Sequence, residues 1–238
     1  MTTELLFRDD AYLTSCEATV LAAAPEGIEL DRTVFYFESG GQPGDSGRLV
    51  WAGDSAVTAA TRKGGSPGSV RHVPAPGSAL PAPGTRVTAE IDWARRHRHM
   101  RMHSCLHLLC ALVKGDVTGG AVGDGKGRLD FNLPDGAPDK DWLTAELNRL
   151  VAADHAVVPR WIDDAEMAAN PGLVRTMSVK PPSGAGRVRL LEIAGVDLQP
   201  CGGTHVRRTG EIGRVEVGKI ENKGKMNRRI NILLVEGA

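Results

Sequence analysis

Two short motifs carry most of the residues in this chain that could do chemistry. One is His103-Ser-Cys-Leu-His107, within a segment predicted to be helical, and the other is Cys201-Gly-Gly-Thr-His205. Histidines four residues apart on a helix lie on one face, about one turn apart. Three imidazoles and one thiolate suit zinc, a borderline-soft ion that prefers nitrogen and sulfur ligands. The motifs therefore predict one Zn2+ site with the ligands His103, His107, Cys201 and His205.

The second motif contains a Gly-Gly pair between its two candidate ligands. Glycine permits backbone angles that other residues avoid, so we expect a tight turn that directs Cys201 and His205 to one point. Each motif by itself is a weak signal, because pairs of histidines on helices and short Cys/His turns are usually incidental. Together they predict a metal site that only folding can assemble.

The elements that must position these residues differ between the two parts of the chain. Up to residue 92, short apolar or alternating runs are separated by Gly/Pro turn clusters, which is typical of a small barrel or a sandwich. We expect strands at residues 18–21, 28–30, 33–37, 48–51, 57–61, 70–73 and 86–91.

The pattern becomes helical at Trp93 and continues to about residue 114. Apolar residues recur there at spacings of three and four, Asp92 is a candidate N-cap and Gly115 a candidate C-cap. The remaining pattern predicts helices at 139–154 and 164–169, and strands at 128–133, 156–162, 188–193, 211–217 and 229–235. The fold class is therefore α+β, with the domains 1–92 and 93–238 and an antiparallel sheet in the second.

Composition and charge restrict the class of protein further. The chain has 238 residues, no formal net charge and 4% aromatic residues, and no apolar run approaches a bilayer span. We find no signal peptide and expect a cytoplasmic protein without a membrane partner. The four cysteines are too scattered for a disulfide framework, and we interpret Trp93, Trp142 and Trp161 as core or boundary residues rather than base-stacking platforms.

The two metal motifs also resemble a known family. His103-x-x-x-His107 upstream of Cys201-Gly-Gly-Thr-His205 is similar to the signature of the alanyl-tRNA synthetase editing domain and of its free-standing relatives, the AlaX proteins. Residues 35–47 resemble the glycine-rich motif of that family, and residues 128–131 resemble its R-x-D-F strand. The resemblance covers nearly the whole chain.

The resemblance implies a fold and an activity. Family members hydrolyse the ester that links serine or glycine to alanine tRNA, using a zinc-bearing α+β domain, and medium-length members carry an N-terminal β-barrel. The chain has no room for an aminoacylation domain, so we expect an editor that acts in trans on the tRNA acceptor end. Phe37, Ser39 and residues 122–127 depart from the family pattern, which leaves the choice between serine and glycine open. We also expect nucleotide and ATP binding.

Several residues are candidates for the reaction itself. Four protein ligands would close a tetrahedral zinc site, so catalysis needs one ligand withdrawn or a fifth position opened. Cys201 and His205 are the candidate catalytic ligands for this reason. Candidates for substrate binding are Thr33, Gln42, Asp45 and Ser104. We interpret Gln42 and Asp45 as residues that shape a turn rather than as catalytic groups, and the resemblance implies a contact of both with RNA.

A dense basic run precedes the first metal motif. Phosphate contacts dominate the affinity of proteins for nucleic acid, so this run is a candidate for binding the tRNA acceptor end. The candidate residues are Arg95, Arg96, Arg98 and Arg101. Two alternatives remain open, namely a zinc hydrolase of a small ester and a non-catalytic RNA-binding protein whose zinc is structural.

Overall fold

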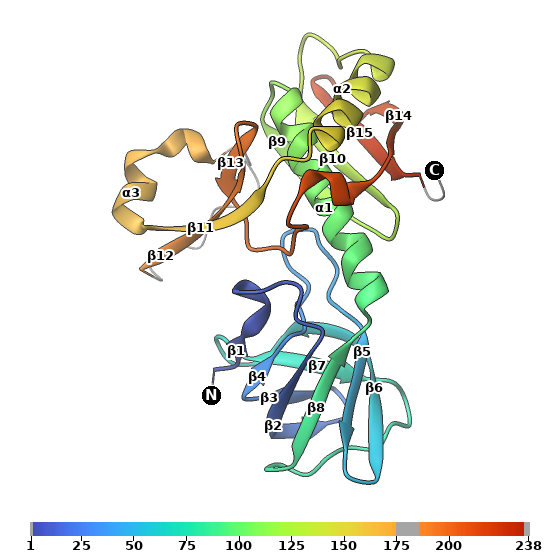
Figure 1. Ribbon diagram of the computed structural model, residues 1–238, viewed down its shortest axis with the longest axis vertical. Coiled ribbons are helices and arrows are strands. Elements are labelled where there is room, and N and C mark those ends of the chain that lie inside the picture. The colour runs from blue at the N-terminus through green and yellow to red at the C-terminus, as the bar shows by residue number, and fades with distance from the viewer. Residues whose placement is uncertain (1, 175–185, 236–238) are drawn as a thin grey trace. The chain divides into compact units, whose positions relative to one another are not determined.

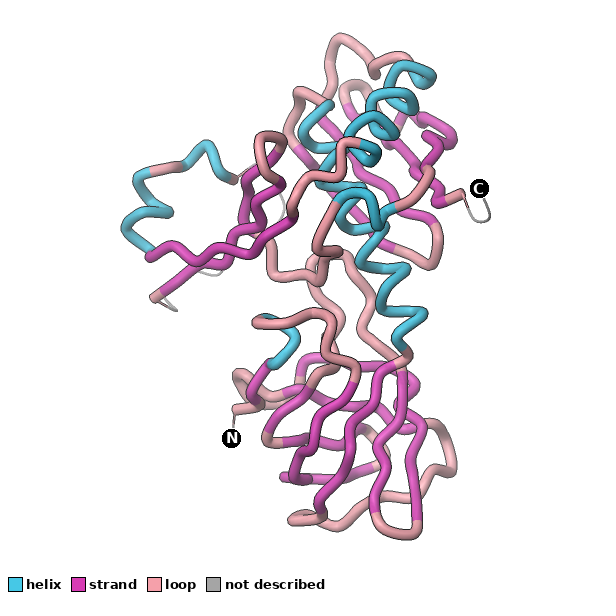
Figure 2. The backbone as a smooth tube through the Cα atoms, in the orientation of Figure 1, coloured by secondary structure: helices cyan, strands magenta, loops and turns pink. Residues whose placement is uncertain are grey.

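The computed structural model describes residues 2–174 and 186–235 and has an α+β fold. The chain forms two compact units, residues 1–97 and 98–238, so the division falls inside the helix that follows residue 92. Figure 2 shows mainly strands in the first unit and both helices and strands in the second. None of the helices in the described part of the chain has the length and apolar character needed to cross a bilayer.

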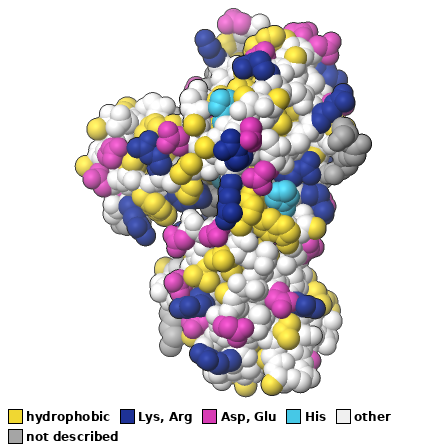
Figure 3. All heavy atoms as spheres, in the orientation of Figure 1, with side chains coloured by type: hydrophobic (Ala, Val, Ile, Leu, Met, Phe, Trp, Pro, Cys, Tyr) yellow, Lys and Arg dark blue, Asp and Glu magenta, His cyan; other side chains and the backbone are white. Residues whose placement is uncertain are grey.

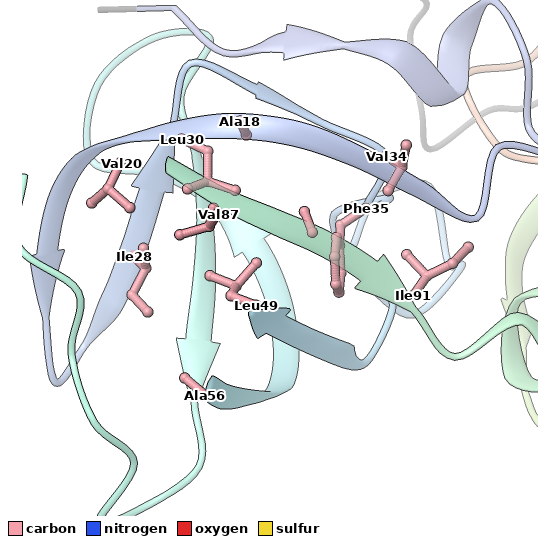
Figure 4. Packing of buried hydrophobic residues seen from close by; sticks show 11 residues of the cluster. Ala18, Val20, Ile28, Leu30, Val34, Phe35, Leu49, Ala56, Val87 and Ile91 are labelled. Atoms are coloured by element: carbon pink, nitrogen blue, oxygen red, sulfur yellow. The ribbon is translucent and has the colours of Figure 1, made fainter. Parts of the chain in front are cut away.

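The first unit is a closed barrel with the strand order β2-β3-β7-β6-β5-β8. Along β8, Val87, Ala89 and Ile91 are buried while the residues between them are more exposed, because successive side chains of a strand point to opposite faces. The inward residues meet in one core around Leu49 and Phe35 (Figure 4). The elements are β1 Glu4–Leu5, η1 Leu6–Arg8, β2 Ser15–Ala24, β3 Gly27–Leu30, β4 Arg32–Thr33, β5 Gly47–Trp51, β6 Asp54–Lys63, β7 Val70–Pro74 and β8 Arg86–Ile91.

One expected strand of the first unit is mostly a loop. The strand predicted at residues 33–37 is limited to β4, Arg32–Thr33, and the glycine-rich segment after it folds as a loop. Gly40 and Gly41 adopt φ values of +57° and +81°, which side chains with a Cβ rarely tolerate. A Cβ on Gly44 would lie 2.0 Å from the backbone oxygen of Thr61. The glycines are therefore required by a turn and by a close approach of two backbones.

The second unit places helices against antiparallel sheets (Figure 1). The helix α1 packs against β10, since a Cβ on Gly127 would meet the sulfur of Met102 at 2.5 Å. Two sheets have the orders β14-β15-β10-β9 and β11-β12-β13. The elements are α1 Trp93–Leu112, β9 Val117–Val122, β10 Lys126–Asn132, α2 Lys140–Ala152, β11 Val157–Asp163, α3 Asp164–Ala169, η2 Pro171–Leu173, β12 Arg187–Ile193, β13 Asp197–Pro200, η3 Thr209–Ile212, β14 Val215–Asn222 and β15 Asn227–Leu234.

The helix caps agree only partly with the sequence. Asp92 accepts a hydrogen bond from the amide of Arg95, as expected of an N-cap. Gly115 is not the C-cap that we expected, because α1 ends at Leu112 and Gly115 has no positive φ. A Cβ on Gly115 would lie 2.7 Å from the backbone oxygen of Asn132, so this glycine serves close packing beside the end of β10.

Three further expectations need correction. The strand predicted at residues 211–217 is a 3-10 turn, η3, followed by β14, and the sequence patterns missed the short strands β9 and β13. Trp142 and Trp161 are 47% and 38% exposed, which excludes the core position and leaves the boundary position of our expectation, whereas Trp93 is half-buried beside Tyr12 and His97.

Candidate metal centre

The four predicted ligands come together in the second unit. One nitrogen of each imidazole and the sulfur of Cys201 all lie within 4.8 Å of one another. The Sγ atom of Cys201 is 3.1 Å from Nε2 of His205 and 3.7 Å from Nε2 of His103. His107 and His205 are buried, and Cys201 is half-buried. Distant parts of the chain thus form one compact cluster of metal-binding groups.

The turn that carries Cys201 is held by hydrogen bonds. The amide of Cys201 donates to the backbone oxygen of Arg189, and the guanidinium of Arg189 donates to the backbone oxygens of Cys201 and Gly203, at 2.8 and 3.1 Å. The amide of Gly203 points to the sulfur at 3.5 Å. Neither Gly202 nor Gly203 has a positive φ, so the turn forms without the left-handed backbone that glycine permits. Arg189 fixes the turn instead.

A buried carboxylate orients His107. Nδ1 of this ring lies 3.0 Å from Oδ2 of Asp197, and the side-chain amide of Gln199 donates to the same oxygen at 2.7 Å. A carboxylate partner keeps the proton on Nδ1 and leaves the lone pair on Nε2 for a metal. Asp197 therefore selects the ring orientation and tautomer of His107 that metal binding requires.

A hydroxyl plays the corresponding part for His205. Oγ of Ser104 lies 3.2 Å from Nδ1 of His205 and accepts a hydrogen bond from the amide of Val206. Ser104 is fully buried. Its hydroxyl therefore already contacts His205 and the amide of Val206. This geometry does not favour the contact with a substrate hydroxyl that we expected of Ser104.

The charges in the cluster favour the thiolate form of Cys201, while a metal would have to displace a proton from His107. Burial raises the pKa of Cys201, but the nearby His103 and His205 outweigh it and hold that pKa well below its ordinary value. Burial lowers the pKa of His107, but hydrogen bonds to Asp197 and Cys201 reverse this and raise it to about 9. Burial and the neighbouring imidazoles lower the pKa of His205. The cluster thus stabilises a thiolate, which is the form of cysteine that binds metals.

The donor set and its spacing fit zinc. Zinc bonds of about 2.0–2.1 Å to nitrogen and about 2.3 Å to sulfur place neighbouring ligand atoms of a tetrahedron roughly 3.3–3.7 Å apart. The distances of 3.1 and 3.7 Å from Cys201 to two imidazoles are close to this range. Small side-chain rotations would therefore suffice for His103, His107, Cys201 and His205 to hold one ion.

The three substrate candidates in the first unit are occupied within the barrel. The hydroxyl of Thr33 lies 2.8 Å from Nε2 of His72, and Thr33 is fully buried. Asp45 accepts hydrogen bonds from the amide of Tyr36 and from the guanidinium of Arg96. Gln42 is buried and forms a β-bridge with Ser39. These contacts support the turn-shaping alternative for Gln42 and Asp45.

The basic run has mixed roles. Arg96 is fully buried, pairs with Asp45 and donates to the backbone oxygens of Val34 and Ala11. Its guanidinium is not presented to a phosphate, so Arg96 is removed from the candidate RNA contacts. Arg95 is half-buried, Arg98 pairs with Asp124, and Arg101 donates to the backbone oxygen of Ile212 at 2.8 Å.

The sequence patterns missed the residues that support the ligands. Asp197 and Gln199 precede Cys201 at intervals of two, which on a strand places all three side chains on one face. That spacing could have indicated an acid and an amide directed at the metal. Arg189 lies on another strand, and no local signal connects it with Cys201.

Comparison with known proteins places the chain in a family. Residues 188–231 match the family model described as the threonyl and alanyl tRNA synthetase second additional domain. A barrel followed by an α+β unit with a His/His/Cys/His cluster thus defines a protein of the synthetase editing-domain class.

Several relatives match this chain over nearly the full length of both proteins. The alanyl-tRNA editing protein AlaX-M of Methanosarcina acetivorans is 36% identical over 98% of this chain and 100% of its own length. AlaX-M of Saccharolobus solfataricus is 32% identical over 96% of this chain and 97% of its own length. An alanine–tRNA ligase of Korarchaeum cryptofilum is 34% identical over 90% of this chain but only 24% of its own length. The chain belongs to the AlaX-M family of alanyl-tRNA editing proteins.

Proposed function

We propose that this chain is an aminoacyl-tRNA hydrolase that removes a wrongly attached serine or glycine from alanine tRNA in a zinc-dependent reaction. The observation that carries the proposal is the cluster of His103, His107, Cys201 and His205, within a chain similar to AlaX-M proteins from end to end. Because the proposed substrate is a charged tRNA, the activity belongs in the cytoplasm. The expected binding of ATP or of another nucleotide as a cofactor has no support in the described residues and is not part of the proposal.

The roles of the chain's own residues follow from the site. A bound zinc ion supplies Lewis-acid chemistry at an ester carbonyl or at a water molecule. Asp197 and Ser104 orient two of the imidazoles, and Arg189 fixes the turn of Cys201. Ser104 occupies the position of the glutamate base in HExxH proteases, but its hydroxyl is engaged with His205. The proton of the attacking group therefore goes to an acceptor other than Ser104.

Binding of the tRNA requires cations for its phosphates. Arg95, Arg98 and Arg101 stay our candidates, since each is partly exposed. Figure 3 shows Lys and Arg side chains interspersed with Asp and Glu on one face of the molecule. Such a surface favours a few specific phosphate contacts over a broad basic patch.

Deacylation assays test the proposed function. The zinc-loaded protein should release serine or glycine from alanine tRNA and spare alanine, and chelation should lower the rate at least about 100-fold because the Lewis acid is lost. The deacylation rate of the Cys201→Ala variant should fall as far as the rate of the chelated protein, while the variant keeps its fold. Cys16→Ala, which changes a cysteine of the barrel unit, should retain activity.

Two other outcomes would replace the proposal. Hydrolysis of serine methyl ester without measurable affinity for tRNA would indicate a small-ester hydrolase. Binding of alanine tRNA with no hydrolysis, together with unfolding of the second unit after chelation, would indicate an RNA-binding protein with structural zinc.

A further inference from the structure

The exposed Trp161 lies in one row with the metal loop. Trp161 on β11 pairs with Arg189 on β12, and the backbone oxygen of Arg189 accepts a hydrogen bond from the amide of Cys201. Neighbouring strands are about 4.8 Å apart, so the backbone of Trp161 is roughly 10 Å from that of Cys201. This is the span of a nucleoside with an acyl group on its ribose.

Trp161 also lies on the face of the sheet that supports the metal ligands. In the sheet, Pro159, Leu191 and Gln199 lie in one row, and Trp161 and Arg189 lie in the row two positions away. Side chains two positions apart along a strand point to the same face, so Trp161, Arg189 and Gln199 share one face. Gln199 and its neighbour Asp197 meet on this face beside His107. The sheet therefore continues without a change of face from the metal centre to Trp161.

Burial along this face decreases in one direction. Leu191 and Ile193, near Asp197 in the ladder, are 1% and 0% exposed, Arg189 is half-buried, and Trp161 is 38% exposed. The opposite face is covered where α3 packs on it, since Ile162, Val188 and Leu190 form a small core there with Met167 of α3. Trp161 is thus no part of that core and lies on the open end of the metal-bearing face.

A cation accompanies the exposed indole. The guanidinium carbon of Arg187 lies 4.4 Å from the centroid of the Trp161 ring. The carboxylate of Asp163, opposite Arg187 in the ladder, accepts a hydrogen bond from the amide of Glu166 at the start of α3. An exposed aromatic ring beside a guanidinium is the combination that binds single-stranded nucleic acid, by stacking on a base and by attraction of its phosphates.

We propose that Trp161 and Arg187 form a platform that binds the terminal nucleobase of the tRNA acceptor end while its ribose ester lies at the His/Cys cluster, an inference that rests on the proposed function. The charge of Arg187 and the row that leads to Cys201 favour a nucleotide over an apolar protein partner. The platform would hold the base and leave the amino acid to the metal centre.

Kinetics with two minimal substrates test the platform. Trp161→Ala should raise KM for serine or glycine esterified to adenosine about 5- to 150-fold, the range for loss of one base–aromatic stack, with a smaller change in kcat. For serine methyl ester, which has no nucleobase, the increase in KM caused by Trp161→Ala should be several-fold smaller. Trp161→Phe should restore most of the KM, because it keeps an aromatic face. Trp142→Ala, which removes an exposed tryptophan of α2, should behave as wild type.

Equilibrium binding separates failure of the platform from failure of the proposed function. Uncharged alanine tRNA and AMP should quench the tryptophan fluorescence of a Trp142→Phe variant more than that of a Trp142→Phe/Trp161→Phe double variant, because Trp51 and Trp93 remain in both and the difference reports on Trp161. Arg187→Ala should weaken the binding of both ligands. If the wild type hydrolyses no ester but tRNA still quenches Trp161, the platform stands and the proposed reaction fails. Equal KM values for Trp161→Ala and wild type on the adenosine ester, or unchanged tRNA affinity, would overturn the platform.

Discussion

His107 is the candidate metal ligand whose surroundings are best defined. Asp197 accepts from its Nδ1 and also binds the amide of Gln199, so the carboxylate is held in place before any metal arrives. Arg96 and Asp45 show the same principle in the first unit, where a fully buried ion pair is satisfied by further hydrogen bonds to backbone oxygens. In both cases a buried charge persists because its partners are fixed.

The first prediction concerns this outer contact of the metal centre. Asp197→Asn should lower zinc affinity about 10- to 100-fold, because outer carboxylates strengthen and orient a ligating histidine. Asp197→Ala should lower it further, since it also removes the acceptor. Zinc affinity can be measured by competition with a chromophoric chelator. The exposed Asp135→Asn is the matched control and should bind zinc as wild type. Wild-type affinity in Asp197→Ala would show that Asp197 has no part in metal binding.

At the scale of elements, the loop of residues 35–47 illustrates how a motif can be structural. Its glycines make a turn and allow a backbone to approach β6, while Asp45 ties the loop to Arg96 at the start of α1. These contacts show that the glycine-rich motif has a structural role within the barrel unit.

The second prediction uses two glycines of this loop. Gly44→Ala should destabilise the first unit by roughly 1–3 kcal/mol, because its Cβ would lie 2.0 Å from the backbone oxygen of Thr61. Gly40→Asn is the control, since nothing lies within 4 Å of that position and Asn tolerates a positive φ. Urea unfolding of the two variants measures the difference. Equal stability of Gly44→Ala and wild type would contradict the close approach.

The third prediction concerns pH and the strand β7. Burial lowers the pKa of His72 to about 4, against an ordinary value of 6.5. Between pH 6.5 and pH 4, His72 therefore takes up a proton in the unfolded chain but not in the folded barrel. The free energy of unfolding is thus highest above pH 6.5 and decreases as the pH falls towards 4. The decrease should reach about 3 kcal/mol.

Comparison of urea unfolding at pH 7 and pH 4.5 checks this expectation. His72→Gln removes the titrating group and should show a smaller decrease between the two values. A wild-type barrel whose stability rises on acidification would disprove the assignment.

At the scale of the whole molecule, all four candidate metal ligands belong to one compact unit. They come from α1 and from the turn after β13, so a bound ion would join two segments that are far apart in the sequence. The first unit contributes none of them.

The fourth prediction follows from this division. Zinc at 100 times its dissociation constant should stabilise the second unit by about 2.7 kcal/mol and leave the barrel unchanged, because only the folded second unit presents the ligands. Hydrogen exchange of residues 2–97 and 98–235, with zinc and after chelation, separates the two effects. If chelation lowered the hydrogen-exchange protection of both units equally, the prediction that zinc stabilises the second unit alone would be wrong.

The sequence by itself predicted the four residues that the structure brings together, the boundaries of α1 and α3 within a few residues and most of the strands. These features rest on local information: the donor atoms of His and Cys, the periodicity of apolar residues and the capping Asp92. The barrel or sandwich alternative was resolved by the structure, which closes β8 onto β2.

Only the tertiary structure decided which neighbours each side chain meets. Arg96 is indistinguishable from Arg98 in the basic run, yet Arg96 is buried on Asp45 and Arg98 is half-exposed. Trp161 is exposed and Asp197 is directed at His107 because of pairings between strands and a helix far apart in the chain. Such pairings depend on the packing of whole elements, which local periodicity does not encode.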